Sequence, residues 1–243
     1  PLKFLLESVK IIEESDKDYT DLAISLLGKG IGLCDKDTDR DLYLKMKLNL
    51  ANNYYNMGEY ARKQALEYYL QVINEGYQFS SKRQEAIIYE RTGHCLFTLD
   101  NETAEEYYNK SLDIYKELND RKSELRLSMR TALLYLTRED KEGDLIGGDD
   151  AYQKYSDIMI KLKSEDNKEA INLIKRNSAF ARFVDEEYAS SSILAGEILD
   201  DGLEYKDASS KDNLIIMSLL GLDIPIWKLN IILGSQYSEG LEG

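Results

Sequence analysis

One phrase recurs along this chain and constrains its fold more than any other feature. It is an alanine followed by an apolar or aromatic residue four positions later, a small or apolar residue after seven, and another apolar residue after eight. The copies are Ala65-Tyr69-Val72-Ile73, Ala104-Tyr108-Ser111-Leu112, Ala151-Tyr155-Ile158-Met159 and a weaker Ala23-Leu27-Gly30-Ile31. Their alanines lie 42, 39 and 47 residues apart. Self-similarity at such a period indicates an array of structural repeats.

Helical periodicity fills each repeat, and we expect an all-α chain because no segment alternates convincingly like a strand. Apolar residues form one helical face at 2–12 and another at 22–31. A helix is then predicted for 42–57, followed by a tight turn at 58–60. The partner helix runs to Asn74 and is ended by Gly76. Further pairs are predicted at Ser81–Leu99 with Thr103–Leu118, Lys122–Thr137 with Ala151–Lys163, and Lys168–Val184 with Glu187–Asp201. Apolar capping helices follow at about 211–236. The prediction is one domain over 1–243, a solenoid of about five antiparallel helix pairs.

Composition and charge narrow the classes of partner. The net charge of −14 argues against direct nucleic-acid binding by this segment, because phosphate contacts need clustered Lys and Arg. The apolar stretch Leu214–Leu233 is interrupted by charged residues and a proline, so we expect packed helices and no membrane contact. Cys34 and Cys95 lie in apolar contexts, which favours reduced core thiols in a cytoplasmic protein; a disulfide is the alternative.

No motif predicts catalysis, a metal site or a cofactor. His94 is the only histidine, so a catalytic triad or a multi-histidine metal site is excluded. We expect a polar residue that faces a groove or lies half-buried between helices. Asp35 to Asp41 alternate like a calcium loop, but Arg40 and Met46 stand where that loop needs Gly and Glu. We therefore expect a solvated connector with an Asp capping the next helix. The Gly-rich stretch 143–150 lacks the Lys-Ser/Thr of a phosphate loop.

The arrangement of small and aromatic residues resembles the tetratricopeptide repeat. The stretch 50–60, Leu-Ala-Asn-Asn-Tyr-Tyr-Asn-Met-Gly-Glu-Tyr, is similar to the family's first helix and turn, and Ala65-Tyr69-Val72-Ile73 to its second helix. Gly93 with the Ala104 phrase gives a second unit, and Ala132 with Tyr135 a looser third. The clearest repeats therefore span 42–118. The resemblance implies a right-handed superhelix whose first helices line a concave groove.

In this family the groove commonly binds a peptide or protein. The residues that the resemblance places there, and that we predict to bind a peptide, are Lys45, Asn49, Asn52, Tyr55, Asn56, His94, Phe97, Arg126, Arg130, Arg176 and Asn177. Asn offers a donor and an acceptor to a peptide unit, Arg pairs with carboxylates, and aromatic rings form apolar pockets. The alternative for the three asparagines is that they are ordinary solvent-facing helix residues.

Two functional hypotheses follow, both non-enzymatic. The Tyr-, Asn- and Lys-rich helices resemble peptide-sensing regulators of Gram-positive bacteria, which implies quorum sensing, transcription regulation and a signalling-peptide ligand. The alternative is a protein-interaction scaffold or dimerisation module, with a homodimer formed through the C-terminal helices and Trp227.

Overall fold

The computed structural model describes residues 6–9, 20–97, 99–138, 146–162, 168–184, 190–191 and 193–194, with the side chains of 168–184 described in part. All regular structure in these ranges is helical, and none of it is a strand. This confirms the predicted all-α class.

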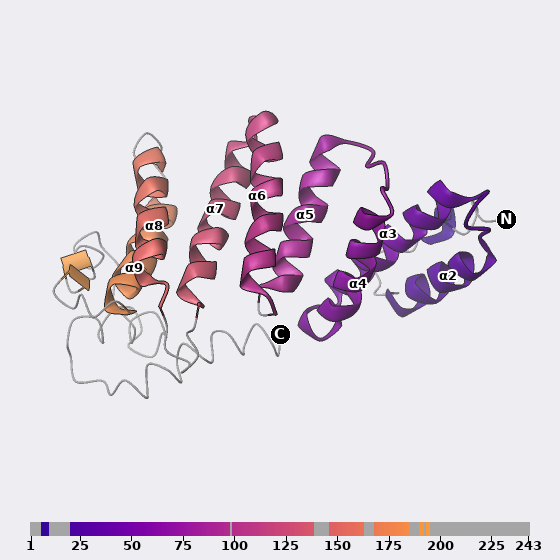
Figure 1. Cartoon of the computed structure of the whole chain (residues 1–243), viewed down its shortest axis with the longest axis horizontal. Helices are drawn as coiled ribbons and strands as arrows, with labels where there is room; N and C mark the ends of the chain where they lie inside the picture. The colour runs from indigo at the N-terminus through magenta and orange to yellow at the C-terminus, as the bar shows by residue number, and fades with distance from the viewer. Residues whose placement is uncertain are drawn as a thin grey trace. The chain divides into compact units, whose positions relative to one another are not determined.

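The helices follow one another along the chain with short connections (Figure 1). They are α2 (Thr20–Leu33), α3 (Arg40–Asn56), the 3₁₀ turn η1 (Glu59–Ala61), α4 (Arg62–Asn74), α5 (Lys82–Leu96), α6 (Asn101–Glu117), α7 (Arg121–Leu136), α8 (Gly148–Leu162) and α9 (Lys168–Val184). Their bounds agree with the predicted helices to within three residues. Most of the helix predicted at Glu187–Asp201 and all of the capping helices predicted at 211–236 lie outside the described residues.

The chain divides into two compact units, with the division inside α6, between Ile114 and Tyr115. Each unit is described separately below. The single domain predicted for 1–243, with its superhelix, stays a prediction.

In the first unit, neighbouring helices pack pairwise: α2 on α3, α3 on α4, and α4 on α5. One cluster of buried side chains joins Leu48 and Ala51 of α3 with Ala65 and Tyr69 of α4 and Ile88 of α5. A second joins α2 to the other side of α3. Between α5 and α6, the buried hydroxyl of Ser111 donates a hydrogen bond to the carbonyl of Ala86, at 2.8 Å.

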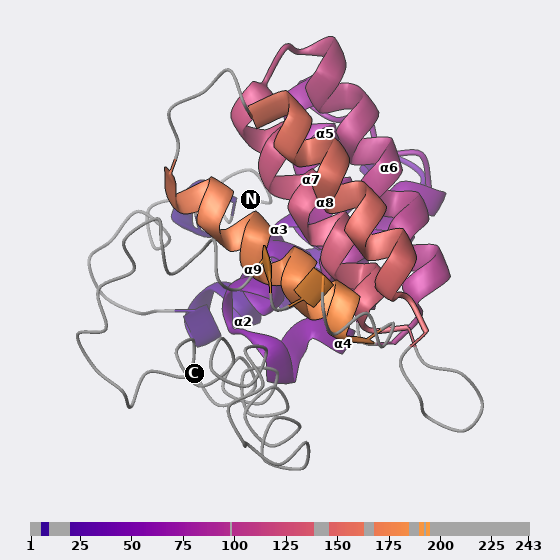
Figure 2. The same cartoon turned by 90° about the vertical axis from the view of Figure 1, so that its left-hand side faces the viewer.

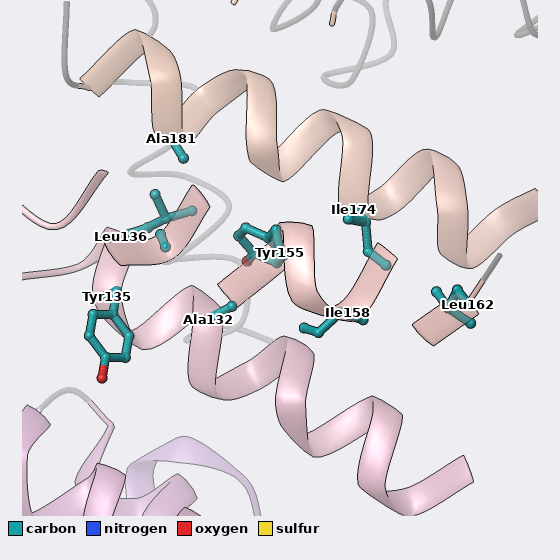
Figure 3. Close-up of a cluster of buried hydrophobic side chains, with 9 residues drawn as sticks. Ala132, Tyr135, Leu136, Tyr155, Ile158, Leu162, Ile174 and Ala181 are labelled. Atoms are coloured by element: carbon teal, nitrogen blue, oxygen red, sulfur yellow. The ribbon is translucent and has the colours of Figure 1, made fainter. Parts of the chain in front are cut away.

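In the second unit, α7, α8 and α9 lie side by side, and Figures 1 and 2 show α8 against both of its neighbours. Figure 3 shows how their core is built, with Tyr155 and Ile158 of α8 lying between Ala132 of α7 and Ile174 of α9. All four side chains are buried.

The recurrent alanines are packing residues. Ala23, Ala65, Ala104 and Ala151 are fully buried, and so are the tyrosines four residues after the last three. A small side chain at this position lets two helix axes approach closely, while the tyrosine ring fills the space beside it. The phrase that predicted the repeat therefore builds the core of each helix pair.

Two turns depend on glycine, and both were predicted. Gly76 ends α4 with a φ of +72°, which confirms its expected role after the helix. Gly58 begins the turn between α3 and α4 with a φ of +95° and a ψ of −160°, a backbone conformation that is essentially restricted to glycine.

An Asp stands at the N-cap of α3, as predicted, but it does not cap the helix by a hydrogen bond. Asp39 is the N-cap residue, and its side chain makes no capping hydrogen bond. Asp35 instead accepts hydrogen bonds from the backbone N–H groups of Asp37 and Thr38, which hold the pKa of its carboxyl below the usual value. The carboxylate that shapes this connector thus stabilises the turn before the helix.

Helix α8 begins three residues earlier than predicted, at Gly148. The backbone N–H of Ala151 bonds to the carbonyl of Gly147, which closes the first turn. Asp149 and Asp150 lie in this turn, where carboxylates are favoured by the helix dipole.

Candidate functional site

A row of asparagines runs along α3 at positions 49, 52 and 56. This spacing places all three on one stripe of the helix. Asn49 and Asn52 are half-buried, and Asn56 is exposed. Among the described residues, neither the Asn49 nor the Asn56 side chain has a hydrogen-bond partner. Asn53, on another face, is buried and donates to the Asn49 carbonyl.

Asn52 is held by one neighbour from each of the next two helices. Its Oδ1 accepts a hydrogen bond from the Tyr69 hydroxyl of α4 at 2.8 Å and from an Arg91 guanidinium N–H of α5 at 2.6 Å. A guanidinium can only donate, so the amide atom facing it must be the oxygen. The Nδ2 donors of Asn52 consequently point elsewhere, and no described side chain or backbone group accepts from them.

Tyr55 and His94 complete the same cluster. The Tyr55 hydroxyl lies 2.6 Å from Nδ1 of His94, and the two rings meet edge to face, with centroids 5.7 Å apart. The Arg91 guanidinium lies over the Tyr55 ring, 4.9 Å from its centroid. Asn52, Tyr55, Tyr69, Arg91 and His94 are called the α3–α5 polar cluster below.

Two ionisable groups near Arg91, the Tyr69 hydroxyl and the Cys95 thiol, are uncharged near neutral pH. Burial raises the pKa of the Tyr69 hydroxyl, and the nearby Arg91 opposes this only in part. Burial also raises the pKa of Cys95 to about 12, against the opposing effect of Arg62 and Arg91. Cys95 is therefore a neutral core thiol without nucleophilic character. Both Cys34 and Cys95 are free thiols, as expected, although Cys34 is only half-buried.

The structure brings together three of the seven residues predicted to bind a peptide in the first unit: Asn52, Tyr55 and His94. Lys45 is exposed one turn before Asn49, and Phe97 is half-buried immediately after α5. His94 has the half-buried polar role that the sequence predicted for it.

The second unit contains the other four predicted residues. Arg126 is exposed and Arg130 half-buried, one turn apart on α7. Asn177 of α9 donates from Nδ2 to the Tyr155 hydroxyl at 3.1 Å, so its amide supports the packing of α8. The side chain of Arg176 lies outside the described residues. A single groove lined by the predicted peptide-binding residues of both units stays a prediction.

Sequence reasoning missed two members of the cluster. Arg91 precedes His94 by three residues, a spacing that places both on one helical face, and this signal was available in the sequence. Tyr69 was assigned to packing; its ring is fully buried, but its hydroxyl also orients Asn52.

The described part of the chain contains no group of three or more His, Cys, Asp or Glu side chains that could hold a metal ion. No helix within the same residues is long and apolar enough to cross a membrane.

The helix pairs, the buried alanine–tyrosine phrase and the polar stripe on a first helix define a tetratricopeptide-like repeat fold. Solved structures have the same fold. A Podosopora anserina protein described as a kinesin light chain with nearly identical TPR-like repeats is 12% identical, with a TM-score of 0.58 over 82% of this chain and 93% of its own. Two structures of this protein, one of them of a single-substitution variant, give these same values. The structure of MamA is 15% identical, with a TM-score of 0.49 over 74% of this chain and 87% of its own.

No protein-family model matches the sequence, and no curated protein matches it. The likeness to the Podosopora anserina protein, at 12% identity, establishes the fold alone. Stacked helix pairs of this kind form extended surfaces that are typical of proteins that bind other proteins.

Proposed function

We propose that this chain is a non-enzymatic binding protein that holds a peptide, or an extended segment of a partner protein, along α3 and α5. The observation that carries the proposal is the asparagine stripe beside the α3–α5 polar cluster. Three amides lie on one face of α3, and the donors of Asn49, Asn52 and Asn56 have no acceptor among the described residues. An extended peptide offers the backbone carbonyls that such donors need.

Helix propensity supports this proposal. Asparagine is an unfavourable residue inside a helix, and three on one stripe lower the stability of α3. Asn53 compensates by bonding within the helix, whereas Asn49 and Asn56 gain no such bond from the described residues. A ligand would provide the missing partner.

The finer form of the proposal is a cytoplasmic sensor of a short signalling peptide within a bacterial regulator. Its support is the resemblance of the helices to peptide-sensing regulators, together with two free thiols, which suit a reducing compartment. A signalling peptide binds as a short free peptide, whereas a scaffold needs a longer segment of its partner. Comparing a selected peptide with its successive truncations by calorimetry separates the two forms.

The test of the general proposal is a binding measurement on the full chain. Peptides are selected by display against the parent chain, resynthesised and titrated by calorimetry. Asn56→Ala removes an exposed amide, with no described partner to disturb, and we expect a several-fold weaker affinity. Asn109→Ala, at an exposed position of α6, is the matched control and should bind like the parent. Equal affinity for both variants, or a selection that yields no binder, would remove the proposal.

The alternative function is a scaffold that dimerises through Trp227, which lies outside the described residues. Light scattering distinguishes it from the peptide-binding proposal. A dimer that Trp227→Ala disrupts, and that Asn52→Ala leaves intact, would favour the scaffold.

A further inference from the structure

Four aromatic side chains follow one another across the first unit, outside the sites described above. Tyr77 and Phe79, in the connection between α4 and α5, have ring centroids 5.4 Å apart. The Phe79 ring lies 6.3 Å from Tyr89 of α5, which lies 6.1 Å from Tyr107 of α6. These four residues are called the aromatic row below. Tyr89 and Arg91 are two residues apart on α5, so they leave the helix on nearly opposite sides, about 200° apart.

Carboxylates lie beside the aromatic row. Asp41 acts electrostatically on the Tyr77 hydroxyl and Glu106 on the Tyr107 hydroxyl; each raises the pKa of its tyrosine, after the larger effect of burial. Asp41 and Glu106 are exposed, and neither forms an ion pair with a described residue. The row therefore borders negative charges that the described part of the chain leaves without a paired cation.

The cations that reach the row are exposed lysines. The Lys110 ammonium lies 4.7 Å from the centroid of the Tyr107 ring. Lys82, whose side chain is 62% exposed, pairs with Glu85 at 3.1 Å. Glu85 also accepts a hydrogen bond from the Tyr89 hydroxyl at 3.3 Å. Exposed ion pairs stabilise little, because water screens them and they restrict long side chains. A cation that binds ring and carboxylate together can therefore displace both lysines.

Elsewhere in the chain, a tyrosine ring with a nearby carboxylate holds an arginine. In the second unit, the Arg182 guanidinium lies 3.6 Å from the centroid of the Tyr152 ring and donates to Asp149 at 2.7 Å. Arg138 lies over the Tyr135 ring in the same way, at 3.8 Å. Among the described residues, no arginine lies over a ring of the aromatic row. The row thus offers the same groups to an arginine from another molecule.

We infer that the aromatic row binds an arginine in a basic segment of a partner protein. A planar guanidinium stacks on an aromatic ring and donates hydrogen bonds to a neighbouring carboxylate at the same time. The net charge of −14 attracts a basic segment over a longer distance. This inference goes beyond the proposed function, because the row shares no residue with the asparagine stripe or the α3–α5 polar cluster.

The first experiment titrates capped tri-arginine into the full chain with ¹³C-labelled aromatic rings. Capped tri-citrulline, similar in shape but uncharged, and capped tri-lysine are the controls. We expect tri-arginine to shift the Phe79 and Tyr89 ring signals saturably, tri-lysine to bind more weakly and tri-citrulline to cause no shift. Tyr60, 74% exposed but outside the row, should not shift. No saturable shift in the row, an equal shift of Tyr60, or equal affinity for tri-lysine would overturn the inference.

The second experiment removes one carboxylate. Glu106→Gln changes an exposed side chain beside the row and should weaken tri-arginine binding several-fold. Glu67→Gln is the matched control, with the same change of charge at an exposed position of α4 that bonds to Gln71 of its own helix. It should bind like the parent. Equal weakening by both variants would show that only the overall charge attracts the peptide, and the inference would fail.

The third experiment removes the lysine that lies over the row. Lys110→Gln uncovers the Tyr107 ring, so tri-arginine should bind it more tightly than it binds Lys116→Gln. The latter variant makes the same change of charge at another exposed position of α6. Equal affinities for the two variants would contradict binding at the Tyr107 ring.

The two proposals fail in distinguishable ways. If display-selected peptides bind but tri-arginine leaves the aromatic row unshifted, the arginine inference is wrong while the proposed function stands. If no peptide is selected and tri-arginine shifts the row saturably, the proposed function fails and the arginine inference stands.

Discussion

Gly93 of α5 lies directly against the ring of Tyr108 of α6. A Cβ at position 93 would stand 2.6 Å from Cδ1 of Tyr108 and 3.0 Å from the carbonyl oxygen of Ala104. The Tyr108 ring is fully buried and cannot swing into solvent. The absence of one side chain at Gly93 thus sets how closely these two helices approach.

Gly93→Ala should therefore destabilise the chain. Overpacking a core of this kind costs about 1–3 kcal/mol, and the better helix propensity of alanine returns about 1 kcal/mol of it. Because the added Cβ would stand only 2.6 Å from a buried ring, the cost lies in the upper half of that range. We therefore expect a net loss of about 1–2 kcal/mol in the free energy of unfolding, measured by urea denaturation. Gly28→Ala in α2 is the matched control, because nothing lies near its added Cβ, and it should stabilise the chain by about 1 kcal/mol. A neutral or stabilising Gly93→Ala would contradict the close packing of α5 and α6.

Ser111→Ala should cost about 1 kcal/mol, the usual contribution of one internal hydrogen bond. The variant lacks the Ser111 hydroxyl and therefore loses the hydrogen bond to the Ala86 carbonyl that joins α6 to α5. Ser25→Ala, at an exposed position of α2, should leave stability unchanged or raise it slightly. Thermal melting of both variants checks this, and equal melting temperatures would show that the buried hydroxyl contributes nothing.

Lys47 and Glu75 should respond unequally to substitution. The Lys47 ammonium is buried, lies 4.3 Å from the Tyr43 ring centroid and bonds to the Glu75 carboxylate at 2.9 Å. Glu75→Ala leaves this buried charge without its carboxylate, whereas Lys47→Met replaces it with an apolar side chain of similar length. We expect Glu75→Ala to cost about 1–2 kcal/mol and Lys47→Met less than half of that. Equal losses in urea denaturation would indicate an ordinary surface pair.

The free energy of unfolding should fall at alkaline pH. Burial raises the pKa of Cys95 from 9.0 to about 12 and raises that of Tyr69 above its usual value. The native state therefore holds these protons at a pH where the unfolded chain releases them, so the stabilising effect is complete below pH 9 and is lost as pH rises toward 12. The free energy of unfolding should decline over this window, and Cys95→Ala should make the decline shallower. If the free energy of unfolding of that variant declines with pH as steeply as that of the parent, the Cys95 thiol does not contribute to the pH dependence.

The fold could be predicted from the sequence to the extent that it depends on local patterns. The spacing of Ala65 and Tyr69 recurs because each helix pair needs the same close contact. Gly76 marks a helix end because the backbone there adopts a positive φ, which favours glycine. The alternating Asp residues between Asp35 and Asp41 predict that one of them caps α3, but not which one. The choice between Asp39 and Asp35 depends on turn geometry, which single residue types do not encode.

The part of the candidate site that could be predicted consists of residues whose spacing within one helix is visible in the sequence. The spacing of Asn49, Asn52 and Asn56 is visible in the sequence, and so are Tyr55 and His94 as members of inner faces. The contact between Asn52 and Arg91 joins positions 39 residues apart and depends on how α3, α4 and α5 pack. No local pattern distinguishes Arg91, which lacks a described carboxylate partner, from Arg62, which has one.

The most direct test of the account is to map a display-selected peptide onto the ¹⁵N-labelled full chain by the side-chain amide signals of its asparagines. Binding along α3 and α5 predicts that Asn49, Asn52 and Asn56 shift with the ligand, while Asn74 and Asn109, exposed on α4 and α6, do not. Shifts confined to Asn74, Asn109 or asparagines outside α3 would contradict the account.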